Sequence, residues 1–249
     1  MTDMAAVHEM VTKLCRLVFA IVQSTTIALP AWRCYCKELK LKSRILPCDI
    51  VTRWNSTYYM LDLAIKYRAV IDAMMADKSL KLRRFELEME EWAIAENLVA
   101  VLLQYKNVTL FFSQDSASVA TVIPAMDRIT NHLNYQTGKA YHPSITAAMK
   151  LARKKMDRYY SLTDSSTTYR IAMVLHSGMK LEYFRNQKWE EEWIEEAESL
   201  VREEYIAEYE KVADESNMTP TKALKAKSDG RFTSFGDLSV TSVPRASEI

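Results

Sequence analysis

The chain has 249 residues, of which 49% are apolar and 26% are charged, as in an ordinary globular protein. Glycine and proline are scarce, with 4 and 6 residues, which argues against a sheet-rich fold with many tight turns and favours long helices. The formal net charge of +1 excludes a histone-like basic protein but leaves room for a local basic groove. No run of about 18 uncharged apolar residues is present, so no membrane partner is expected.

The first predicted element is an amphipathic helix over residues 4–24, where apolar residues recur at three- and four-residue steps. Pro30 is expected to end any helix, because proline cannot continue one. Residues 31–50 are then predicted as a connector in which apolar residues interleave with cations. The positive charge of its middle comes from Lys37, Lys40, Lys42 and Arg44.

The rest of the chain shows further helical stripes and no convincing strand with a period of two. One helix is predicted from about Thr57 to Met75. The later stripes fall at residues 92–112, 119–133, 142–159, 169–175 with a resumption at 180–184, and 188–211. The fold class is therefore predicted as all-α, an irregular multi-helix domain of about seven or eight helices, with a disordered tail beyond Asp214 that is rich in Ser, Thr, Lys, Gly and Pro.

The cysteines and histidines give no metal signature. Cys34 and Cys36 are too close together for a usual zinc pair, and no histidine follows at finger spacing. All four cysteines are predicted to be free thiols in a reducing compartment. The spacing therefore predicts no metal site.

Residues 49–61 read Asp-Ile-Val-Thr-Arg-Trp-Asn-Ser-Thr-Tyr-Tyr-Met-Leu. This run resembles the Asp-x-x-Thr-Arg-Trp-Asn-Ser-Thr segment of hAT-family DNA transposases. Residues 4–46 resemble the helical stretch that precedes it in that family, and residues 169–189 resemble a later block and the start of a Trp-rich helix. The resemblance extends over roughly residues 4–212 in the expected order.

The resemblance implies a particular piece of a larger architecture. Such transposases have a zinc-binding DNA module, a ribonuclease-H-like core, a helical insertion in that core and a dimerisation region. Their core holds two divalent metals, such as Mg²⁺, on three acidic residues. This chain matches the insertion, so the catalytic acids are expected before Met1 and after Ile249; we predict no catalytic residue, no cofactor and no enzyme activity.

The same resemblance divides the chain into three predicted parts. Residues 1–48 form an N-terminal helix and basic connector, and residues 49–213 form the helical domain that resembles the transposase insertion. Residues 214–249 form a flexible tail that leads toward the dimerisation region. The family block reads Leu-Asp-Pro-Arg-Tyr-Lys where this chain has residues 175–180, so an acid, a proline and an arginine are replaced in a turn between two helices.

The predicted DNA-binding residues are Arg53, Trp54, Asn55, Lys40, Lys42 and Arg44. By resemblance, Trp54 stacks on a base flipped out of the DNA, which is worth about 1–3 kcal/mol per base. Arg53 is expected to hold a backbone phosphate. The alternatives are a core tryptophan with Ser56 or Thr57 as a helix N-cap, an arginine in a local ion pair, and a connector that is merely solvated.

The sequence therefore predicts a nuclear DNA-binding fragment of a hAT-like transposase. Its expected partners are transposon ends or hairpin-like DNA, and other transposase chains. The alternative function is a transposon-derived helical module that binds protein and not DNA. A diverged but intact nuclease is the third reading, and the missing upstream aspartates argue against it.

Overall fold

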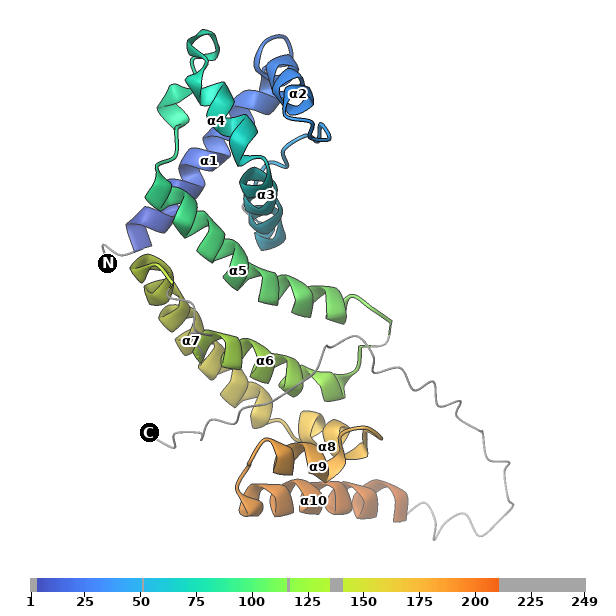
Figure 1. The fold of residues 1–249 in the computed structure, drawn as a ribbon. Coiled ribbons are helices and arrows are strands. Elements are labelled where there is room, and N and C mark those ends of the chain that lie inside the picture. Colours follow the sequence, from blue (N-terminus) through green and yellow to red (C-terminus); the bar gives the residue numbers. More distant parts are fainter. Residues whose placement is uncertain (1–3, 51, 116, 135–140, 211–249) are drawn as a thin grey trace. The chain divides into compact units, whose positions relative to one another are not determined.

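The computed structural model describes residues 4–50, 52–115, 117–134 and 141–210, and every regular element in these ranges is helical (Figure 1). The predicted all-α fold is confirmed, with ten α-helices in the described ranges where seven or eight were predicted. The predicted tail over residues 214–249 lies outside the described residues. The α-helices are α1 (Ala5–Gln23), α2 (Ala28–Glu38), α3 (Trp54–Lys66), α4 (Arg68–Ala76), α5 (Met89–Phe112), α6 (Val122–Asn134), α7 (Pro143–Asp164), α8 (Thr167–Leu175), α9 (Lys180–Asn186) and α10 (Glu191–Tyr205).

Short helical turns join several of these elements. They are the 3₁₀ turns η2 (Lys78–Leu80), η3 (Arg83–Phe85) and η4 (Val119–Thr121), and the π-helical turn η5 (Ile206–Glu210) that continues α10. The chain divides into two compact units. Unit 1 comprises Met1–Ala117 and Pro124–Tyr160, and unit 2 comprises Ser118–Ile123 and Ser161–Ile249. The division into residues 1–48, 49–213 and 214–249 stays a prediction.

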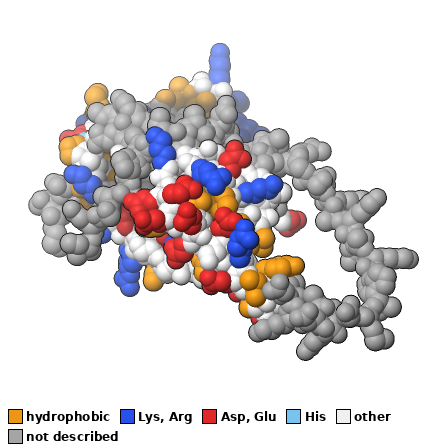
Figure 2. Space-filling view, turned by 90° about the horizontal axis from the view of Figure 1, so that it is seen from below, with side chains coloured by type: hydrophobic (Ala, Val, Ile, Leu, Met, Phe, Trp, Pro, Cys, Tyr) orange, Lys and Arg blue, Asp and Glu red, His pale blue; other side chains and the backbone are white. Residues whose placement is uncertain are grey.

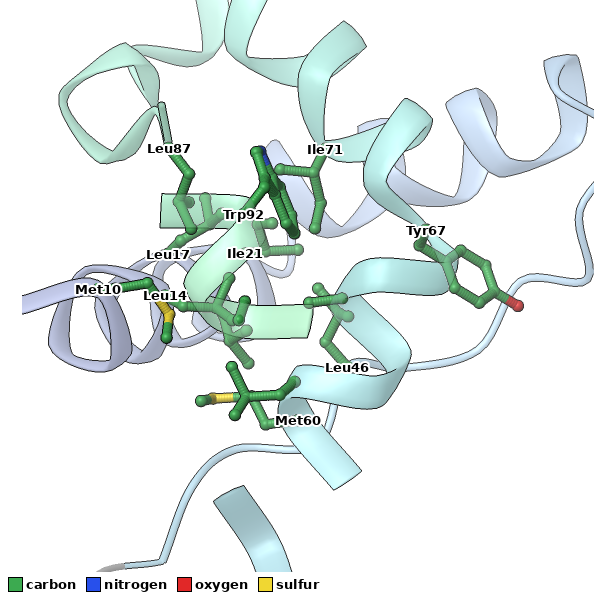
Figure 3. Close-up of a cluster of buried hydrophobic side chains, with 14 of the residues drawn as sticks. Met10, Leu14, Leu17, Ile21, Leu46, Met60, Tyr67, Ile71, Leu87 and Trp92 are labelled. Atoms are coloured by element: carbon green, nitrogen blue, oxygen red, sulfur yellow. The ribbon is translucent and has the colours of Figure 1, made fainter. Parts of the chain in front are cut away.

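The main core lies in unit 1 and is built largely from α1 to α5 (Figure 3), with additional buried side chains from α6 and α7. In it, α1 packs against α2 and α5, α3 packs along α5, and α2 packs against α4. One face of α1 is fully buried at its apolar positions, as the three- and four-residue spacing requires. Burying each such side chain contributes roughly 1.5–3 kcal/mol. The large side chains shielded completely or almost completely from solvent include Met10, Leu14, Leu17, Ile21, Trp32, Leu46, Met60, Ile71 and Trp92.

Pro30 does not end a helix, contrary to the prediction. It is the third residue of α2, where the backbone amide has no partner within the helix, so the missing N–H of proline costs little. The Ser24 hydroxyl oxygen accepts a hydrogen bond from the amide of Ala28 at 3.1 Å and satisfies one of the free amides. The predicted connector is therefore helical up to Glu38, and of the described residues before α3 those at 39–50, 52 and 53 are irregular.

The single helix predicted from Thr57 to Met75 is two helices. Its first residue is Trp54, and Tyr67 separates α3 from α4. Tyr67 leaves the helical conformation at φ −106° and ψ 17°, while its amide still donates to the carbonyls of Leu63 and Ala64. Because Tyr67 itself is 6% exposed and belongs to the core, the break keeps the apolar faces of both helices on one cluster.

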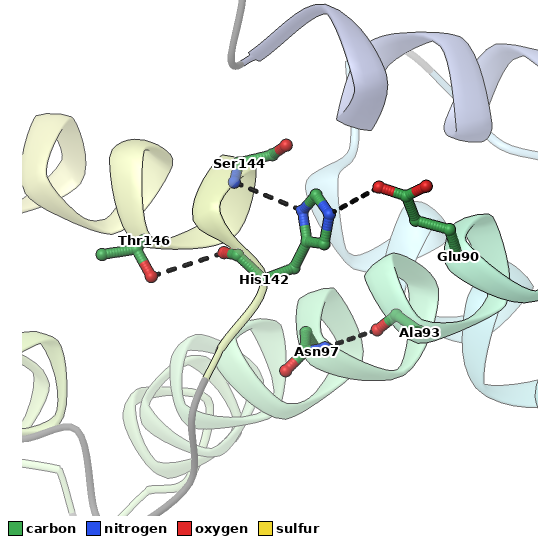
Figure 4. Close-up of polar contacts among 6 residues, drawn as sticks. All are labelled: Glu90, Ala93, Asn97, His142, Ser144 and Thr146. Carbon is green, nitrogen blue, oxygen red and sulfur yellow. Dashed lines mark hydrogen bonds and ion pairs between the residues drawn. The ribbon is translucent and has the colours of Figure 1, made fainter.

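Two polar contacts attach α5 to its neighbours. Glu88 and Glu91 form a capping box at its start. The carboxylate of Glu91 also forms an ion pair with the ammonium group of Lys13 in α1, with Nζ and Oε1 2.6 Å apart. His142 precedes α7, and its ring lies 3.0 Å from the carboxylate of Glu90 (Figure 4). The other ring nitrogen of His142 accepts from the amide of Ser144 at 3.3 Å, which caps the predicted helix start at Pro143.

Unit 2 contains α8, α9 and α10, which pack on one another. Phe184 is fully buried and lies against Trp189, with ring centroids 4.8 Å apart. The turn between α8 and α9 is built by His176, whose Nδ1 accepts from the amide of Gly178 at 3.2 Å. The exposed face of α10 is acidic. Figure 2, which views the molecule of Figure 1 from below, shows a group of acidic side chains.

Among the described residues, no single helix has the length and apolar character needed to cross a membrane. Helices α1 and α2 meet that test only when they are taken together, and a bend of 99° separates them.

Candidate nucleic-acid interface

The basic connector, residues 39–53, is held on the core by its backbone. The indole N–H of Trp32 donates to the carbonyl of Arg44 at 2.9 Å. The hydroxyl of Tyr67 donates to the carbonyl of Lys42. The centroids of these two aromatic rings lie 5.5 Å apart. Leu46 inserts into the same core and is 2% exposed (Figure 3). Main-chain hydrogen bonds therefore fix the connector without using its cationic side chains.

Lys40 has the left-handed backbone conformation, with φ 55°. It follows the C-cap of α2, and its amide donates to the carbonyl of Lys37 at 3.1 Å. The next amide, of Leu41, donates to the carbonyl of Cys36 at 2.8 Å. These two bonds form a Schellman motif, which usually has glycine at this position. A lysine costs some backbone strain there and places a charge at the start of the connector.

The cations of the connector face solvent together with several apolar side chains. Lys40, Lys42 and Arg44 are all exposed. Exposed apolar residues alternate with them, namely Leu39, Leu41, Ile45 and Ile50. The surface is therefore both cationic and apolar, which suits a nucleic acid with accessible bases as well as a protein partner.

A network centred on Asp49 builds the turn that leads into α3. Its Oδ1 accepts hydrogen bonds from the hydroxyls of Ser56 at 2.6 Å and Thr57 at 2.8 Å. The Ser56 hydroxyl oxygen also accepts from the amide of Ile50 at 2.7 Å. These side chains were predicted as possible N-caps, but α3 begins earlier and they tie its first turn back to Asp49 instead. The polar residues of the recognised segment thus have a structural role.

Arg53 lies at the tip of this turn, as the N-cap residue of α3, and its side chain is exposed. Its amide donates to the carbonyl of Ile50 at 2.7 Å, and its carbonyl accepts from the amide of Ser56 at 2.8 Å. Trp54 is the first residue of α3, and its side chain lies outside what the structure describes. Asn55 is half-buried, and its Oδ1 is buried without a hydrogen-bond partner among the described residues.

The six predicted residues therefore fall into two groups in unit 1. The connector holds Lys40, Lys42 and Arg44, and the turn of residues 49–57, hereafter the Asp49 turn, holds the other three. Within the described ranges, no hydrogen bond or ion pair joins the two groups. They are linked through the backbone between Leu46, which is anchored in the core, and Asp49.

A groove beside the Asp49 turn was not predicted from the sequence. It consists of a hollow of about 590 Å³ along α1 and η3 and a second hollow of about 420 Å³ that Asp49 and Cys48 help to line. Arg16, Arg84 and Phe85 line both hollows, so the two hollows are adjacent. The sequence places Arg84 in a Lys- and Glu-rich link, where nothing marks it as part of a groove.

Phe19 lines the smaller hollow and is 59% exposed. Arg84 lies over the ring of Phe85, with its guanidinium carbon 4.7 Å from the ring centroid. The groove therefore combines two guanidinium groups with two aromatic rings.

Cys15 and Cys48 also line the smaller hollow, and all four cysteines are free. Burial raises the pKa of the Cys15 thiol to about 11, with a further rise from the charge of Asp49 and from the hydrogen bond to its carboxylate. Neutral thiols are poor metal ligands. No group of three or more His, Cys, Asp or Glu side chains that could hold a metal occurs in the described part of the chain.

Comparisons with known proteins cover the part of the chain that carries these features. Residues 2–101 match the family model of the ZBED1 RNase-like helical domain. Over 170 residues, the chain is 29% identical to a protein of Talaromyces stipitatus named "Putative transcriptional regulator tpeD". That match covers 66% of this chain but only 17% of the relative. No solved structure matches the chain. The helices from α1 to the first half of α5, with the connector and the Asp49 turn between them, are thus similar in sequence to an RNase-like helical domain.

Proposed function

We propose that this chain is a DNA-binding helical module related to hAT-type transposases, which binds DNA and does not cut it. The observation that carries the proposal is the exposure of four cationic side chains on two neighbouring segments that are fixed to the core. Arg53 is exposed at the tip of the Asp49 turn, and the connector beside it exposes Lys40, Lys42 and Arg44. The match to the ZBED1 RNase-like helical domain and the naming of the fungal relative as a "putative transcriptional regulator" support a role on DNA.

Phosphate contacts are the first part of the proposed mechanism. The connector is fixed through its carbonyls, so its lysine and arginine side chains remain available for phosphate oxygens. Arg53 adds a guanidinium that can hold one phosphate through two parallel N–H groups. Because each contact releases counterions, affinity should fall steeply as salt rises.

Base stacking is the second part. By resemblance, Trp54 stacks on an unpaired or flipped base next to the phosphate that Arg53 holds. The Asp49 network supports this proposal because it fixes the backbone of both residues at the start of α3. Asn55, the third predicted residue of the turn, belongs to the same proposed interface, and its Oδ1 has no hydrogen-bond partner among the described residues. The acidic outer face of α10 repels DNA and is not expected to take part.

The proposed setting follows from the proposed ligand. The protein acts in the nucleus, with transposon ends or hairpin-like DNA as partners, and other chains of its own kind associate on the same DNA. The protein itself contributes binding energy and no cofactor chemistry. Any DNA cleavage that accompanies binding belongs to a catalytic core that uses divalent metal.

A second candidate function is a protein-binding module. It is favoured by the exposed Leu39, Leu41, Ile45 and Ile50, which alternate with the cations of the connector. Apolar groups exposed close together on a surface often mark a protein contact. This function predicts a folded protein that binds no DNA at low salt.

The test is the salt dependence of binding to a labelled DNA duplex, measured by fluorescence anisotropy. Replacing both Lys42 and Arg44 with alanine removes two charges but keeps the two carbonyls that Trp32 and Tyr67 use. For the double variant, we expect the slope of log K against log salt to become less steep by about two. For Arg53→Ala, we expect it to become less steep by about one. The control replaces Lys154 and Lys155, two exposed lysines of α7, with alanine. Equal slopes for the connector variant and wild type would contradict the proposal.

A further inference from the structure

The groove formed by α1 and η3 presents two arginines and an exposed aromatic ring beside the Asp49 turn. We infer that it binds an unpaired nucleotide of the DNA strand, with the phosphate on Arg16 and Arg84 and the base against Phe19. This inference rests on the proposed function and extends it, because it names a second binding site and the form of DNA that fills it.

The charge of the groove favours an anion. Arg16 and Arg84 line both hollows, and neither forms an ion pair with a carboxylate in the described ranges. Lys13 is already paired with Glu91, and Asp49 accepts hydrogen bonds from two hydroxyls and the Cys15 thiol. At the lining that both hollows share, a phosphate therefore meets two guanidinium groups that form no ion pair in the described ranges, while the carboxylates of Glu9 and Asp49 each line only one of the hollows. Such groups bind phosphate through paired N–H donors.

The apolar lining favours a base. Phe19 is 59% exposed although it lines a hollow, so much of its side chain is open to a ligand. The two adjacent hollows, of about 590 and 420 Å³, are within the size range of small-molecule sites and can take one nucleotide. Exposed aromatic side chains next to cations are the usual platform for single-stranded nucleic acid.

The position of the groove joins it to the proposed interface. Asp49 lines the smaller hollow and also holds Ser56 and Thr57 at the start of α3. A strand whose phosphate lies on Arg53 can therefore continue into the groove. Glu9 lines the larger hollow, so we place the phosphate at the shared lining and the base in the smaller hollow, which Glu9 does not line.

The test uses a labelled duplex that carries one unpaired 5-iododeoxyuridine. Arg16→Ala and Arg84→Ala should each weaken its binding about 5- to 10-fold and lower the salt slope by about one. Phe19→Ala should weaken this DNA but leave a fully paired duplex within about twofold. Arg83→Ala is the matched control, because Arg83 lies next to Arg84 in η3 but is paired with Glu86 at 3.4 Å.

Photocrosslinking of the iodinated base gives the direct readout. After irradiation and trypsin digestion, the crosslink should map to the peptide Leu17–Arg33, which contains Phe19. If the folded protein binds no DNA, both the proposed function and this inference fail. If Arg53→Ala weakens binding while the groove variants behave like Arg83→Ala and the crosslink maps elsewhere, only the groove assignment fails.

Discussion

The indole N–H of Trp32 donates to the carbonyl of Arg44 across 2.9 Å, and this bond joins the core to the basic connector. Because Trp32 is 1% exposed, its indole N–H is shielded from water and depends on this carbonyl for a hydrogen bond. The buried Trp32 thus fixes the position of the basic connector on the surface. The connector is ordered by hydrogen bonds to its main chain and by the buried Leu46, although its cationic side chains face solvent.

Trp32→Phe should lower the free energy of unfolding by about 1–3 kcal/mol, because it removes this hydrogen bond and some packing and leaves a carbonyl unpaired. Tyr67→Phe removes the matching bond to Lys42 and should cost about 1 kcal/mol. Urea denaturation of both single variants and the double variant gives the coupling energy. Because both bonds hold one segment, the two effects should not be additive, and strict additivity would contradict a shared role.

Lys40→Gly should remove a charge without loss of fold. Glycine relieves the left-handed strain at this position, so the free energy of unfolding should be unchanged or higher by up to about 1 kcal/mol. Lys188→Gly is the matched control, since Lys188 has φ 55° and the same pair of hydrogen bonds after α9. In fluorescence anisotropy, only Lys40→Gly should weaken DNA binding. If Lys40→Gly and Lys188→Gly weaken binding equally, the assignment of Lys40 to the DNA interface is wrong.

Cys15 should be alkylated far more slowly than Cys48 at pH 8. Burial and the nearby Asp49 raise the pKa of Cys15 to about 11, so little thiolate is present, whereas Cys48 is exposed. Iodoacetamide labelling followed by mass spectrometry measures both rates. The Cys15 rate should rise with pH towards about 11, and Asp49→Asn should increase it at pH 8. Equal labelling of the two thiols in the native protein would contradict the described packing; unfolding in urea should equalise them.

The stability of the protein should fall below about pH 6.5 through His132. Burial, with the nearby charge of Arg128, lowers the pKa of His132, and its Nε2 is buried without a hydrogen-bond partner in the described chain. Above pH 6.5 the imidazole is neutral in both states. Below it the unfolded chain binds a proton that the folded chain does not, so the free energy of unfolding falls until the folded pKa is reached.

His132→Gln should flatten this part of the pH dependence, whereas His8→Gln, at an exposed position, serves as the control. Thermal unfolding between pH 7 and 5 measures the difference. If His132→Gln leaves the pH dependence of the stability unchanged, groups other than His132 cause the acid sensitivity.

Much of the fold follows from local sequence signals, and the exceptions have physical causes. The stripe of α1 predicts its buried face, because a 3.6-residue period requires it. The same spacing cannot tell that Phe19, at the margin of the stripe, lies 59% exposed in a groove, since that depends on where η3 packs. The prediction for Pro30 is wrong because a proline in the first turn of a helix and a proline after its end differ only in their context.

The candidate site was predictable only in part. The segment that contains Arg53 could be found because a run of fixed residue types resembles a known family. Its supporting network was not predictable, because the hydroxyls of Ser56 and Thr57 bond back to Asp49 and do not cap the helix in the ordinary way. Arg16 and Arg84 are 68 positions apart and meet only through the packing of η3 on α1.

The most direct test of the account compares a labelled DNA hairpin with a matched duplex, by fluorescence anisotropy across salt concentrations, for wild type and Trp54→Ala. Trp54→Phe should retain part of the stacking, and Tyr59→Ala removes a different exposed aromatic from the same helix as a control. The account predicts steep loss of binding with salt and a selective loss of hairpin affinity in Trp54→Ala of about 5- to 100-fold. If neither DNA binds the folded protein at low salt, the chain is not a DNA-binding module.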